Sequence, residues 1–185
     1  MNSRYNNAVK LFDEYNAADP HGKEVLYAQR MSERLEKFKP DAPEHVRLAI
    51  RCQHIGRWQI PRNTYPNGKK GYIAWRNKLK DHHAAIAGGI LEKVGYDKAM
   101  IDMVQDLLEK KDLRNNPNTQ LLEDVVCLVF VEFYLEEFAA KHDDEKVIDI
   151  LSRTFKKMTQ HAIDVASTFN LPPHAKDLLS KAASR

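Results

Sequence analysis

The segment of residues 51–66 gathers arginine, aromatic, proline and histidine side chains within a short span. A guanidinium group binds anionic oxygens as a fork, and it also stacks on aromatic rings. A protein core does not require this mixture of side chains. The segment therefore predicts a surface that holds a planar or anionic ligand, without identifying the ligand.

Side chains of this loop and of the helix after it are candidates for contacts to a phosphorylated ligand: Arg57, Trp58, Arg62, Tyr65 and Arg76. The arginines would neutralise phosphate oxygens, and Trp58 or Tyr65 would stack on a base. The alternative is a loop pinned by the packing of these two rings, with its arginines bonded to helix ends. Lys110 also has two interpretations, a phosphate contact or a cation that favours the dipole at the end of its helix.

Four more side chains could converge on a divalent cation: His54, His83, Glu123 and Asp124. Histidine and carboxylate ligands from different helices of a bundle are a known way to hold such an ion. Asp124 lies in a strongly apolar run, where a carboxylate needs a cation, an arginine or a backbone donor as its partner. The alternative for Asp124 is an internal salt bridge to Arg51 or Arg30. The alternative for His54 is a core histidine whose hydrogen bonds are made within the protein.

Helical spacing of apolar residues dominates the chain, and β-branched runs are scarce. Proline and glycine positions divide the pattern, with a loop at residues 57–69. The predicted helices cover residues 3–17, 23–38, 41–56, 72–93, 97–110, 120–140, 144–157 and 159–169, followed by a short tail helix. The residues of the 120–140 helix are apolar on all sides, which is typical of a buried central helix. We expect a single all-α domain over residues 1–185.

The 185 residues are long enough for one domain with its own core, and the formal net charge is only +3. This charge balance argues against a protein built mainly to coat nucleic acid. No apolar run approaches the ~20 residues that cross a bilayer. Residues 1–7 lack the apolar stretch of a secretory signal, so we expect a cytoplasmic protein without a membrane partner.

Three segments resemble the ligand helices of the HD-domain phosphohydrolases: residues 49–57, 83–91 and 122–128. Their order and spacing fit that family across roughly residues 22–140. The resemblance implies an HD-like bundle of about eight helices, with its core at about 22–140 and helices of 144–185 packed on it. Tyr27 replaces the first ligand histidine, and Gln53-His54 replaces the His-Asp pair. The implied metal site is therefore either changed, to His54, His83 and Asp124, or lost.

The whole chain is more similar to a family catalogued as a domain of unknown function, number 4202. The matching motifs are residues 27–31, 53–66, 71–76, 120–124 and 156–158. They cover most of the chain, and the family implies no activity.

The HD resemblance implies a metal-dependent phosphohydrolase for a nucleotide or another phosphorylated metabolite. A divalent transition metal (Mn, Fe, Co, Ni or Zn) would lower the pKa of a bound water to make the nucleophile. In that reading Glu123 and Asp124 are the catalytic carboxylates, and Gln53 joins the ligand-binding residues. The alternative is a metal-free, non-catalytic nucleotide- or anion-binding module on the same scaffold. A structured-RNA partner is a weaker third hypothesis.

Overall fold

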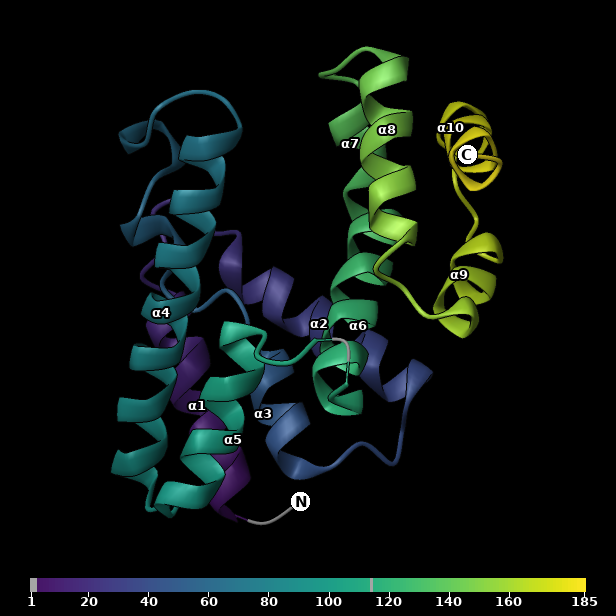
Figure 1. The fold of residues 1–185 in the computed structure, drawn as a ribbon. Coiled ribbons are helices and arrows are strands. Elements are labelled where there is room, and N and C mark those ends of the chain that lie inside the picture. The colour runs from purple at the N-terminus through teal and green to yellow at the C-terminus, as the bar shows by residue number, and fades with distance from the viewer. Residues whose placement is uncertain (1–2, 114) are drawn as a thin grey trace. The chain divides into compact units, whose positions relative to one another are not determined.

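The computed structural model describes residues 3–113 and 115–185, so the first two residues of the N-terminal stretch considered above lie outside it. Within the described part of the chain every regular element is helical, and the predicted all-α fold is confirmed (Figure 1). These residues form ten α-helices and two 3-10 helices, more than the eight or so expected. Their contacts divide the chain into two compact units, Met1–Thr119 (unit 1) and Gln120–Arg185 (unit 2), and each is described by itself.

Unit 1 contains five complete α-helices, two 3-10 helices and the first turn of a sixth α-helix. They are α1 (Ser3–Asn16), α2 (Glu24–Phe38), α3 (Glu44–Arg51), η1 (Arg57–Gln59), η2 (Arg62–Thr64), α4 (Lys69–Val94), α5 (Lys98–Glu109) and the start of α6 (Pro117–Phe133). Apolar side chains from these helices, including Phe12, Met31, Leu48 and Leu79, are fully buried. They form the core that positions the site described below.

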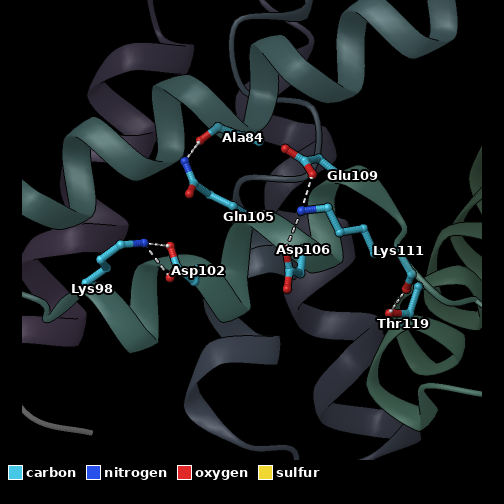
Figure 2. A network of polar contacts seen from close by, with 8 residues as sticks. All are labelled: Ala84, Lys98, Asp102, Gln105, Asp106, Glu109, Lys111 and Thr119. Atoms are coloured by element: carbon cyan, nitrogen blue, oxygen red, sulfur yellow. Dashed lines mark hydrogen bonds and ion pairs between the residues drawn. The ribbon is translucent and has the colours of Figure 1, made fainter.

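Helices α4 and α5 lie side by side, as Figure 1 shows, and they are joined by a tight reversal. Gly95 ends α4 in the left-handed conformation at φ 89°, and Asp97 then caps α5 by accepting from the Met100 N–H. Figure 2 shows Gln105 of α5 reaching back to the Ala84 carbonyl of α4 at 3.0 Å. A side chain at Gly88 would collide with this amide, because its Cβ would lie 2.4 Å from Gln105 Nε2.

The chain after α5 is held by a second group of polar contacts, also visible in Figure 2. Lys111 Nζ lies 2.6 Å from Asp106 Oδ1 and 2.7 Å from Glu109 Oε2. The Thr119 hydroxyl donates to the Lys111 carbonyl at 3.0 Å. These contacts close the turn between α5 and α6 within unit 1.

The third helix is shorter than the predicted 41–56. It begins after Pro43, whose extended backbone precedes Glu44, and Asp41 lies before the helix, where it pairs with Lys39. It ends at Arg51, and the following residues form turns up to Gly56 at φ 68°. His54 therefore lies on a turn after the helix, which changes the direction in which its ring can point.

Unit 2 is built from the remainder of α6, α7 (Leu135–Ala139), α8 (Asp144–Phe155), α9 (Gln160–Ser167) and α10 (Pro173–Ala183). The predicted 120–140 helix breaks at Tyr134, whose φ of −126° and ψ of −13° leave helical geometry. Helices α8 and α10 pack on each other, and Leu128 and Leu151 are fully buried in this unit. None of the described helices combines the length and the apolar character that crossing a membrane requires.

Candidate functional site

His54 is surrounded on three sides by groups of unit 1. Its ring stacks on Tyr27 with centroids 4.1 Å apart and planes 14° apart. Its Nε2 lies 3.3 Å from Arg57 Nη1, and its Nδ1 lies 3.8 Å from Glu24 Oε2. A guanidinium group can only donate, so we assign Nε2 as the acceptor and Nδ1 as the protonated nitrogen.

His83, in the middle of α4, has the same tautomer as His54. Its Nδ1 lies 2.6 Å from the Ile55 carbonyl oxygen, which can only accept, so Nδ1 carries the proton. The remaining nitrogen, Nε2, keeps its lone pair for another donor. The two imidazole rings lie close together, with centroids 5.9 Å apart. The turn of residues 52–56 therefore supplies one histidine and fixes the orientation of the other.

A small recess opens beside these two rings. Its lining residues are Gln53, His54, Arg76, Leu79, Lys80, His83, Leu108 and Lys110. The recess leaves about 10 Å³ for the centre of a water-sized sphere, which is room for about one water molecule. Three of the lining side chains are cationic and none is acidic. A small anionic group at the mouth of the recess would meet these three cationic side chains.

Both histidines are neutral near pH 7. Burial, assisted by the cations Arg57 and Arg76, lowers the pKa of His83 to about 3, although the hydrogen bond to the Ile55 carbonyl opposes the shift. Burial likewise holds the pKa of His54 well below its ordinary value, with contributions from Arg57 and His83. A positive charge on either imidazole is unfavourable beside these cations, so both rings serve here as neutral hydrogen-bonding groups.

Glu24 is the residue of this region that the sequence reasoning missed. Its side chain is 13% exposed, and burial raises its pKa to about 7 although Arg57 opposes the shift. The available signal was its position on α2, three residues before Tyr27 and so on the same helical face. A carboxyl group that titrates near neutrality beside His54 can be present in either charge state.

Arg57 connects the loop to α4. Its guanidinium carbon lies 4.8 Å from the centre of the Trp75 ring, and the Trp75 indole N–H donates to the Ile60 carbonyl at 2.8 Å. The loop ends against α4 at Gly71, where a Cβ would lie 1.9 Å from the Pro66 carbonyl oxygen. Only glycine allows this approach, so the loop is pinned at both ends.

The candidate ligand-binding residues divide into two groups. Gln53, Arg76 and Lys110 line the recess, and Arg57 contacts His54 beside it. The other three have contacts within the loop or with α1. Arg62 donates to the carbonyls of Tyr65 and Pro66 at 2.9 and 3.0 Å, and the Trp58 ring packs on Tyr15 at 5.9 Å. Trp58 and Arg62 thus have internal contacts of the kind that the alternative of a pinned loop describes, and Tyr65 contributes its backbone carbonyl.

The two candidate catalytic carboxylates belong to unit 2. Asp124 Oδ1 accepts from the Thr159 N–H at 2.9 Å and from Gln120 Nε2 at 3.0 Å, and its Oδ2 accepts from the Thr159 hydroxyl at 2.7 Å. A backbone donor and two neutral side chains are thus its partners, while Arg51 binds Asp13. Glu123 Oε1 lies 3.9 Å from Lys157 Nζ. Asp124 joins α6 to the start of α9.

The donor groups around His54 and His83, taken within unit 1, do not fit a resident transition metal. Among the residues that the structure describes, no group of three or more His, Cys, Asp or Glu side chains could hold a metal ion. In unit 1, Nε2 of His54 already faces Arg57, and cations line the recess. A divalent ion would be repelled by those charges, and two imidazoles fall short of the three protein ligands that catalytic zinc sites use.

The low pKa of His83 predicts how the stability of unit 1 depends on pH. Its ordinary pKa is 6.5 and its folded value is about 3, so between these values the unfolded chain binds a proton that the folded chain does not. Stability should therefore fall as the pH drops from 6.5 towards 3. Asparagine at this position keeps an N–H that can reach the Ile55 carbonyl, but its amide does not titrate. In the His83→Asn variant the free energy of unfolding should therefore depend less steeply on pH, by the slope that corresponds to about one bound proton.

Urea unfolding between pH 4.5 and 7.5 measures this difference. Both tryptophans, Trp58 and Trp75, lie in unit 1, so their fluorescence reports that unit. Wild type and variant share Glu24 and His54, and the comparison therefore isolates His83. If the free energy of unfolding changes with pH by the same amount in the wild type and in His83→Asn, the fold does not hold His83 neutral.

The comparisons with known proteins give one match. A family model described as "Domain of unknown function (DUF4202)" matches residues 6–179. Searches of curated proteins and of solved structures returned no match to this chain.

Proposed function

The chain belongs to the DUF4202 family, and we propose that unit 1 binds a phosphorylated small molecule without a resident metal. One observation carries the proposal. The recess beside the two neutral imidazoles is lined by Arg76, Lys80 and Lys110 and by no acidic side chain. Such an arrangement favours an anion over a cation.

A phosphate group matches the hydrogen-bonding groups around the recess. Arg76 and the two lysines donate to anionic oxygens, and a guanidinium fork can bind two oxygens at once. The Gln53 carbonyl oxygen already accepts from the Tyr27 hydroxyl at 2.9 Å, so its amide N–H groups are directed elsewhere. His83 Nε2 can accept from a hydroxyl of the ligand. The recess has room for about one water molecule, so the anionic group would bind at its mouth and the rest of the ligand outside.

The test is equilibrium binding of pyrophosphate in the presence of EDTA, with two lysine variants of α4. Lys80 lines the recess, whereas Lys78 is exposed and lies about 200° away around the helix. Lys80→Gln should weaken binding about fivefold, corresponding to about 1 kcal/mol. Lys78→Gln makes the same chemical change outside the recess and should leave the affinity unchanged.

Calorimetry at two salt concentrations provides the decisive readings. Affinity should fall as salt rises, because exposed charges are screened. No binding of pyrophosphate by the wild type, or an equal loss in both lysine variants, would reject the proposal.

The second candidate is the metal-dependent phosphohydrolase expected from the HD resemblance. One observation favours it: His83 donates from Nδ1 to a backbone carbonyl and leaves Nε2 open, as metal-ligating histidines do. Purification without chelator, followed by metal analysis of the wild type and of His83→Ala, tests it. Stoichiometric metal that is lost in the variant, together with phosphate release from a nucleotide panel, would favour the enzyme over the binding module.

A further inference from the structure

The aromatic rings near the recess differ in how much of their surface is available. Trp75 is 6% exposed and is covered by Arg57, and Trp58 packs on Tyr15. Tyr72, in contrast, is 50% exposed, although its ring lies 5.8 Å from that of Trp75. An exposed ring that lies against a buried one still offers a free face to a ligand.

Tyr72 lies on the same face of α4 as the residues that line the recess. It precedes Arg76 by four residues, so the two side chains are about 40° apart around the helix and about 6 Å apart along it. Lys80 and His83 continue this stripe towards the interior. Burial lowers the pKa of Arg57, and Tyr72 is among the groups that partly oppose this shift.

We infer that Tyr72 is a stacking platform for a planar aromatic group of the ligand, whose phosphate is held by Arg76 and Lys80. The inference rests on the proposed function and narrows it to nucleotides over other phosphorylated metabolites. The spacing of about 6 Å along the helix suits a mononucleotide, in which a sugar separates the base from the phosphate. This assignment differs from the sequence-based expectation, in which Trp58 or Tyr65 stacks on the base.

Calorimetric binding of adenosine 5′-monophosphate and of ribose 5-phosphate to the whole chain tests the inference. The two ligands share the phosphate and the sugar, so their difference in affinity reports the base. Tyr72→Ala should weaken binding of the nucleotide by about 5- to 150-fold and leave binding of ribose 5-phosphate unchanged. Tyr72→Phe keeps the ring and should keep the affinity. Ile73→Ala truncates a neighbouring side chain that is 47% exposed on another face of α4, and it should have no effect.

The outcomes separate this inference from the proposed function. If the wild type binds both ligands equally, or if Tyr72→Ala weakens both by the same factor, the stacking role is overturned while phosphate binding stands. If neither ligand nor pyrophosphate binds, the proposed function is overturned and the stacking role with it.

Discussion

Replacing Asp124 with alanine is expected to destabilise unit 2 by about 3 kcal/mol. Asp124 is 2% exposed, and its carboxylate accepts three hydrogen bonds, from Gln120 Nε2, the Thr159 N–H and the Thr159 hydroxyl. Its removal leaves these half-buried donors without this acceptor, and a donor that loses its partner in the interior costs about 1–3 kcal/mol, so the lower end of this range applies to each. The loss should loosen the start of α9, where Thr159 is also the N-cap. Hydrogen exchange of α9 peptides, followed by mass spectrometry, measures the effect.

Variants of Thr159 distinguish this structural role from catalysis. Thr159→Ser keeps the hydroxyl and should retain protection of α9, whereas Thr159→Val removes the hydroxyl and should lose part of it. The combination of Asp124→Ala with Thr159→Val should cost less than the sum of the two changes, because the residues share a hydrogen bond. A stable Asp124→Ala protein that keeps full α9 protection but loses metal or ligand would instead support the catalytic role.

Replacing Arg76 with glutamine is expected to weaken pyrophosphate binding by about 10- to 150-fold. Arg76 lines the recess, and a hydrogen bond to a charged group contributes about 1.5–3 kcal/mol. The side chain is only half-buried, so the fold should tolerate the change. Arg76→Lys keeps the charge without the fork and should give an intermediate affinity. Titration calorimetry in EDTA measures all three proteins.

Arg153→Gln is the matched control for Arg76. Arg153 pairs with Asp149 on the exposed surface of α8, so the same loss of charge occurs in unit 2. Its affinity for pyrophosphate should equal that of the wild type. If Arg76→Gln and Arg153→Gln weaken binding equally, the anion is attracted by net charge alone and not by the recess.

The helices were largely predictable because their signals are local. Gly95 ends α4 as expected, since the left-handed conformation there favours glycine, and Asp97 caps α5. The break of the 120–140 helix at Tyr134 was missed because apolar residues continue through it. Helical periodicity does not reveal a change in direction when both sides of the break are buried.

The site was predictable in part. His54 and His83, two of the four side chains that could converge, have ring centroids 5.9 Å apart. Their tautomers depend on Ile55 and Arg57, which are tertiary partners that the sequence does not reveal. The sequence showed that Asp124 needs a partner, and it could not show that Thr159, 35 residues away, supplies it. Glu24 was missed for the same reason, because its raised pKa arises from burial in the folded chain.

The most direct test of the account is the protonation state of the two imidazoles with and without an anion. Long-range ¹H–¹⁵N NMR spectra of the histidine rings at pH 6 resolve neutral and charged rings. We predict neutral, Nδ1-protonated rings for His54 and His83, and signals that shift saturably with pyrophosphate while those of His174, exposed in unit 2, do not. Protonated rings at positions 54 and 83, or signals that saturating pyrophosphate leaves unchanged, would contradict the account.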